Sequence, residues 1–107
     1  MARRGKSDVV VRDVRLVQDA LRKYAASHPS ADIQVRRQNS VSIRIRIIDL
    51  DFEGTALVER DTQLWDILDP LPEEVRSQIT MLLLLTPKEA KTSFANMEFD
   101  HLIESAF

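Results

Sequence analysis

The sequence predicts a single α+β domain: a small three-stranded sheet with helices packed mainly on one face, in the order α-β-β-α-α-β-α. Residues 41–47 alternate between apolar and polar side chains, residues 10–24 carry apolar side chains at helical spacing, and residues 79–86 are almost continuously apolar. A chain of 107 residues has the ordinary size of one domain. We therefore expect a disordered basic tail over residues 1–7 and one domain over residues 8–107.

Composition excludes several classes of function. The chain has no cysteine, so disulfides, thiolate nucleophiles and thiolate metal sites are ruled out. Its longest apolar run, residues 81–85, is far shorter than the roughly 20 residues that span a bilayer. The basic N-terminus is not followed by the apolar stretch of a secretory signal, so the expected location is the cytoplasm.

The first half of the chain predicts a helix and then a hairpin. The helix covers residues 9–27, with Ser7 or Asp8 as its N-cap. The hairpin joins a strand around residues 33–35 to the alternating strand at residues 41–47, which would bury one face. Its outer face would be basic, and the candidate residues for this face are Arg36, Arg37, Arg44 and Arg46.

The second half predicts two helices, a strand and a helical C-terminus. Residues 55–68 form a helix whose apolar stripe includes Leu57 and Val58, and a short helix begins near Pro72. The apolar run at residues 79–86 is interpreted as an inner strand, covered by helices and flanked by neighbouring strands. Residues 86–89, Thr-Pro-Lys-Glu, are typical of a capping box that starts a further helix.

These segments together resemble the BolA-like family over roughly residues 10–91. Phe52 and Gly54 match a Phe-x-Gly turn after the alternating strand, Arg60 falls at the arginine of an Arg-His pair, and residues 86–89 match the step into the last helix. The resemblance implies a BolA-like fold, similar to the KH type. It also implies a partner role toward monothiol glutaredoxins, with which BolA-like proteins can share a [2Fe-2S] cluster.

The chain departs from the family at the histidines. Asp61 follows Arg60, and Gln78 precedes the apolar strand, at the two positions where the family has histidine. A carboxamide is a poor ligand for iron, so the resemblance implies that [2Fe-2S] ligation is weakened or lost, and no cofactor is predicted. The partner-binding residues carried over are Arg60, Asp61 and Gln78. The only histidines, His28 and His101, are interpreted as surface residues.

No enzymatic motif is present. The chain lacks a Walker loop, a dinucleotide-binding glycine pattern and a nucleophile elbow. Asp49 and Asp51 lie at a turn, where carboxylates commonly make local hydrogen bonds. Together with Glu53 and Glu59 they could attract a divalent cation, although the spacing is not that of a calcium loop. We expect a non-enzymatic adaptor or regulatory domain that acts through protein contacts.

Two alternatives concern other partners. The first is a nucleic-acid-binding regulator that uses the four arginines of the basic strand face. However, Gly5 and Gly54 are the only glycines, so the Gly-x-x-Gly loop of KH domains is absent. The second concerns the apolar C-terminus, which either covers the domain's own core or forms a homodimer through the C-terminal helix. Its apolar residues are Phe94, Phe99, Leu102, Ile103 and Phe107.

Overall fold

The computed structural model describes residues 6–100, and it describes side chains from residue 11 onward. The elements are α1 (Lys6–Ser27), β1 (Asp32–Asn39), β2 (Ser42–Ile48), the 3-10 helix η1 (Leu50–Phe52), α2 (Leu57–Leu68), α3 (Glu73–Arg76), β3 (Ile79–Leu85), α4 (Pro87–Thr92) and α5 (Phe94–Asp100). The predicted α+β class and element order are confirmed. The C-terminal helix restarts as α5, because the backbone of Ser93 is extended.

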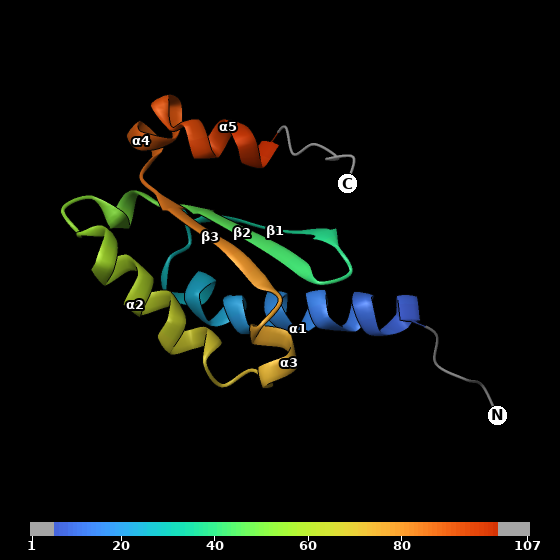
Figure 1. Cartoon of the computed structure of the whole chain (residues 1–107). Coiled ribbons are helices and arrows are strands. Elements are labelled where there is room, and N and C mark those ends of the chain that lie inside the picture. Colours follow the sequence, from blue (N-terminus) through green and yellow to red (C-terminus); the bar gives the residue numbers. More distant parts are fainter. Residues whose placement is uncertain (1–5, 101–107) are drawn as a thin grey trace.

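The sheet has the strand order β1-β2-β3. β1 and β2 form an antiparallel hairpin, whereas β2 and β3 are parallel and are connected through α2 and α3. Helices α1, α2 and α3 lie on one face of the sheet, as predicted, while α5 lies over the other face (Figure 1). The arrangement therefore has three layers, with the sheet in the middle.

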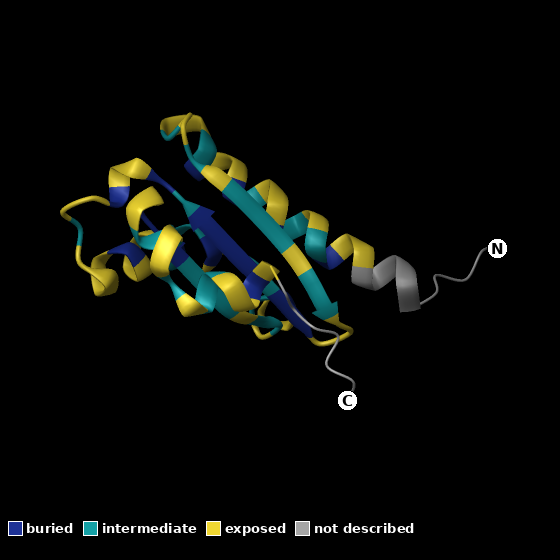
Figure 2. Ribbon diagram, turned by 90° about the horizontal axis from the view of Figure 1, so that it is seen from above, coloured by how far each residue is buried: buried dark blue, intermediate teal, exposed yellow. Residues whose placement is uncertain are grey.

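The core lies between β2 and the layer formed by α1, α2 and α3. Ile43, Ile45 and Ile47 of β2 are each 0% exposed, which confirms the face that the alternating pattern predicted to be buried. Figure 2 shows that β2, the central strand, is the most continuously buried one. The main cluster also contains Phe52 of η1, Leu84 of β3 and six side chains from the helices: Val17, Leu21, Tyr24, Leu64, Leu68 and Val75.

The turn before α2 depends on a glycine. Gly54 has a φ of +78°, a left-handed conformation that side chains disfavour. No atom lies within 4 Å of the position that a Cβ would occupy at Gly54. The glycine is therefore required by the backbone conformation and not by a close neighbour, which agrees with its interpretation as a turn residue.

Some predicted details are wrong. β3 is an edge strand that pairs with β2 alone among the described strands, and not an inner strand with neighbours on both sides. Its apolar character comes instead from helices above and below it. α1 already includes Lys6, Ser7 and Asp8, so neither Ser7 nor Asp8 caps it. The rest of the expected tail, residues 1–5, and the C-terminal residues 101–107 lie outside the described residues.

Within residues 6–100, every helix is too short or too polar to cross a lipid bilayer.

Candidate protein-contact site

An apolar groove lies between the first turn of α2 and the edge of β3; we call it the α2–β3 groove. It has a volume of about 410 Å³ and is lined by Leu57, Val58, Asp61 and residues 82–85. Leu57 is 66% exposed and Val58 is 77% exposed. Exposed apolar side chains beside the edge of a sheet are typical of a surface where another polypeptide docks.

The position of α2 relative to the core explains this exposure. The core-facing positions of α2 are Arg60, Leu64 and Leu68, which recur every four residues and are all buried. Leu57 and Val58 belong to the turn before this stripe and extend past the core. The expectation that Leu57 belongs to the buried stripe and that Val58 widens it is therefore wrong, because helical spacing alone does not tell where the covered part of a helix begins.

Arg60 is built into the fold and is only 4% exposed. Its Nε donates to the carbonyl of Thr55 at 2.8 Å, and its Nη1 donates to the carbonyl of Leu84 at 3.1 Å. Its two terminal nitrogens also contact the carboxylate of Glu89 at 2.6 and 3.2 Å. The guanidinium carbon lies 5.4 Å from the centre of the Phe52 ring. The buried side chain of Arg60 thus connects α2 to β3 and α4.

Glu89 completes this connection through the predicted capping box, which is confirmed. The hydroxyl of Thr86 accepts from the backbone of Glu89 at 3.1 Å, and the carboxylate of Glu89 accepts from the backbone of Thr86 at 2.9 Å. The hydrogen bond from Arg60, reinforced by the backbone of Thr86, lowers the pKa of Glu89 to about 2. The carboxylate is therefore charged at neutral pH and fixes the start of α4.

Gln78 lies at the opposite end of β3 and is also occupied by internal contacts. Its side-chain oxygen accepts from Arg37 at 2.7 Å. Its side-chain nitrogen donates at 2.8 Å both to the carboxylate of Asp13 on α1 and to the carbonyl of Glu74. These contacts join α1, α3 and the hairpin where β3 begins.

The carboxylate of Asp13 is the acceptor at the centre of this network. Burial by itself raises the pKa of Asp13, but hydrogen bonds from Gln78 and Arg12 and the charges of Arg12 and Arg37 outweigh it. The net result is a pKa below the usual value, so Asp13 is ionised at neutral pH. Gln78 therefore has a structural role, as a neutral donor to a buried carboxylate.

The three predicted partner-binding residues do not form one surface. Arg60 and Asp61 lie near the C-terminal end of β3, and of these two only Asp61 is exposed and lines the groove. Gln78 precedes the first residue of β3, at the other end of the strand. These residues do not fit a [2Fe-2S] cluster, because they are separated and supply neither imidazole nor thiolate. Their role in partner binding stays a prediction.

The four arginines of the hairpin divide between the two faces of the sheet. Arg36 pairs with Arg44 across the hairpin, and these two share the outer face with Arg46. Arg37 instead pairs with Ile43, whose side chain is buried on the inner face. The expectation that all four lie side by side is thus wrong for Arg37, because consecutive residues of a strand point to opposite faces.

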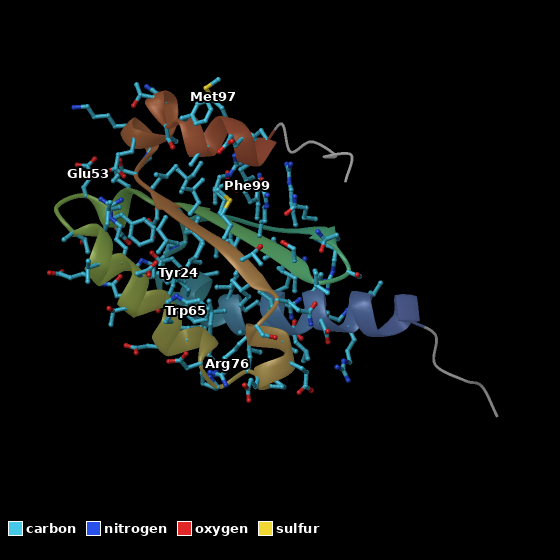
Figure 3. All side chains as sticks on the ribbon, in the orientation of Figure 1. Tyr24, Glu53, Trp65, Arg76, Met97 and Phe99 are labelled. Carbon is cyan, nitrogen blue, oxygen red and sulfur yellow. The ribbon has the colours of Figure 1, made fainter. Side chains whose placement is uncertain are left out.

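The outer face of the sheet is covered by α5. Phe99 is 0% exposed, and its ring centre lies 4.6 Å from the guanidinium carbon of Arg46 and 5.0 Å from that of Arg36. Arg46 donates at 2.8 Å to both Asn96 and Asp100, and is itself 5% exposed. Figure 3 shows Phe99 pointing from α5 toward the sheet. The basic face is therefore largely occupied by the chain's own C-terminal helix.

Of the residues that line the α2–β3 groove, only Asp61 is among the predicted partner-binding residues. Leu57 and Val58 were assigned to the core, and residues 82–85 were assigned to an inner strand. The available signal was the pair of adjacent apolar residues, Leu57 and Val58, at the start of the helix, beside the polar Glu59. That signal could not be interpreted without knowing that β3 lies at the edge of the sheet.

Comparison with known proteins supports the fold. No protein-family model matches the chain, and no curated protein matches its sequence. Among solved structures, the chain is similar to the BolA domain of SufE1 from Arabidopsis thaliana. The TM-score is 0.50 and the sequence identity is 21%, over 73% of this chain and 94% of that chain. The protein described here has a BolA-like fold, as its sequence predicted.

Proposed function

We propose that this chain is a non-enzymatic adaptor or regulatory domain that binds a partner protein through the α2–β3 groove. The observation that carries this proposal is the groove itself, where two strongly exposed apolar side chains stand beside a strand edge. A partner segment could extend the sheet along β3 and cover Leu57 and Val58. Asp61, at the rim of the groove, would select the charge of the partner.

The BolA-like fold suggests a monothiol glutaredoxin as the partner to test first. Since Asp61 and Gln78 supply neither the thiolate nor the imidazole that usually holds a [2Fe-2S] cluster, such a complex would depend on protein contacts. Any shared [2Fe-2S] cluster would have to be held largely by thiols of the partner. This proposal concerns the contact surface, and cluster binding by this chain is not needed for it.

The experiment is a titration of isotope-labelled protein with a monothiol glutaredoxin, with and without a reconstituted cluster. We expect the amide signals of residues 57–61 and 82–85 to shift most. Val58→Glu should weaken binding at least 10-fold, because it places a charge in the apolar contact. Val41→Glu is the matched control, since Val41 is 67% exposed at the hairpin turn, away from the groove.

Three results would separate the possible failures. An absence of shifts in both cluster states would exclude this partner class. Shifts confined to other surfaces, or equal weakening by Val41→Glu and Val58→Glu, would exclude the groove. A titration with short nucleic acids tests the alternative, which requires an affinity that falls steeply with salt and after Arg44→Ala and Arg46→Ala.

We rank nucleic-acid binding second, because Arg36 and Arg46 are engaged by α5. The homodimer alternative rests on Phe94 and Met97, which are 71% and 58% exposed on α5. Truncation after Lys91, followed by measurement of mass in solution, tests that alternative. A change from dimer to monomer supports an interface, and loss of folding supports a role in the core.

A further inference from the structure

A second group of side chains gathers where the ends of α1 and β2 meet. His28 follows α1 directly, Asp49 follows β2, and Asp51 lies in η1. The Nδ1 atom of His28 is 2.7 Å from Oδ2 of Asp51 and 3.3 Å from Oδ2 of Asp49. One ligand atom from each of the three residues lies within 4.8 Å of the other two. Two segments of the chain, the end of α1 and the connection from β2 to η1, thus bring three metal-ligating groups together.

The surrounding structure holds these groups in place. The ring of Tyr24 stacks on that of His28, with centroids 3.9 Å apart and planes 7° from parallel. The hydroxyl of Tyr24 donates to Oδ2 of Asp49, and the backbone of Asp51 donates to Oδ1 of Asp49 at 3.0 Å. Burial, together with the hydrogen bond to Asp49, raises the pKa of Tyr24, so its hydroxyl remains a donor at neutral pH. Such partners orient metal ligands in known sites.

The charge of the group favours a cation. The side chain of Asp49 is 0% exposed, and a buried carboxylate is costly unless an opposite charge lies beside it. In the part of the chain that the structure describes, no Lys or Arg forms an ion pair with Asp49 or Asp51. Among the described residues, His28 is the only basic side chain that contacts the two carboxylates. With a neutral imidazole, the three side chains together carry a charge of −2, which a divalent cation would neutralise.

We propose that His28, Asp49 and Asp51 form a binding site for a divalent transition-metal ion, with Zn²⁺ as the best fit. One imidazole and two carboxylates match the ligands of zinc, whereas Ca²⁺ and Mg²⁺ prefer oxygen ligands alone. Zinc–ligand bonds of about 2.0–2.2 Å put tetrahedral ligand atoms about 3.4 Å apart. The distances from His28 to the two carboxylates, 2.7 and 3.3 Å, lie close to this spacing, and the carboxylate oxygens lie within 4.8 Å of each other. His28 is 27% exposed, which leaves an approach from solvent.

The test uses the full chain and two probe ions. Zn²⁺ binding is measured by calorimetry, and Co²⁺ binding by the visible absorption of a tetrahedral cobalt complex. We expect one ion per chain, and at least a 10-fold loss of affinity in both His28→Gln and Asp51→Asn. Asp51 is 56% exposed in its side chain, so Asp51→Asn should leave the fold intact, which an amide spectrum checks.

Two matched controls make the result specific. His101→Gln removes the only other histidine, and Glu53→Gln removes an exposed acid two residues from Asp51. Both variants should bind as the parent does. The proposal is overturned if neither ion binds, if His101→Gln loses binding while His28→Gln does not, or if Glu53→Gln weakens binding as much as Asp51→Asn.

Discussion

The two faces of β2 are both buried, but by different chemistry. On the inner face, Ile43, Ile45 and Ile47 pack against α1 and α2 without polar groups. On the outer face, Arg46 is 5% exposed beneath α5, where Phe99 covers it and Asn96 and Asp100 accept its hydrogen bonds. Burial of a charged side chain is tolerated there because partners satisfy most of its donors. A strand with alternating apolar and basic residues can therefore be the central strand of a sheet that has helices on both faces.

The faces should also differ in what they contribute to stability. The inner face stabilises the whole domain, since its side chains join the sheet to the helices of the first layer. The outer face contacts α5, a short helix that can separate while the rest stays folded. Burial of Arg46 also carries a partial cost, because its Nε has no hydrogen-bond partner among residues 6–100.

The largest effect is expected from Ile45→Ala on the inner face. Ile45 is 0% exposed, and removing its side chain leaves a cavity in the main core. We expect the free energy of unfolding to fall by about 3 kcal/mol. Urea unfolding followed by circular dichroism measures this loss. A loss below about 1 kcal/mol would mean that the inner face is not the main source of stability.

A smaller and more local effect is expected from Arg46→Ala on the outer face. The substitution removes hydrogen bonds to Gln34, Asn96 and Asp100 and the contact with Phe99, so we expect a loss of about 1.5 kcal/mol. Hydrogen exchange should increase mainly in α5.

Arg44→Ala is the matched control for Arg46→Ala, because the only hydrogen bond of the Arg44 side chain within the described residues goes to Gln38. It should change stability by less than about 0.5 kcal/mol. If both substitutions leave the exchange of α5 unchanged, the outer face does not hold that helix.

The smallest effect is expected from the ion pair between Arg60 of α2 and Glu89 of α4, at the C-terminal end of β3. Folding lowers the pKa of Glu89 from its usual 4.5 to about 2, so the folded state binds the proton less tightly than the unfolded state does. The resulting stability is complete above pH 4.5 and is lost as the pH falls toward 2. Since the side chain of Glu89 is 43% exposed, screening reduces the contribution to about 1 kcal/mol.

Comparison of the parent with Glu89→Gln at several pH values measures this contribution. The free energy of unfolding of the parent should fall more steeply than that of Glu89→Gln between pH 4.5 and 2. Parallel pH profiles for the two proteins would show that the contact between Arg60 and Glu89 adds no stability. Asp61→Asn, which changes an exposed acid next to Arg60, serves as the control and should keep the slope of the parent.

The local elements could be predicted from the sequence, because each depends on residues close together in the chain. Alternation at residues 41–47 predicted both the strand β2 and its buried face. The Phe-x-Gly pattern predicted a turn at Gly54, and the spacing of Thr86 and Glu89 predicted a capping box. Backbone periodicity and hydrogen bonds between near neighbours decide these features. Together they were enough to indicate the BolA-like fold.

The candidate sites were harder to predict, because residues from distant segments form them. Arg60 was expected on a contact surface, yet its guanidinium lies inside and contacts Glu89, 29 residues later. His28 was interpreted as a surface residue, although it lies beside Asp49 and Asp51, which the sequence places more than 20 positions away. No local pattern contains these pairings.

The sequence by itself therefore determined the elements, their order and the apolar face of the sheet. Only the tertiary structure decided that β3 is an edge strand, that α5 covers Arg46, and that Leu57 and Val58 remain exposed. The physical reason is that periodicity fixes the direction in which a side chain leaves its own helix or strand. What that side chain then meets depends on how the layers pack, and packing is a property of the whole chain.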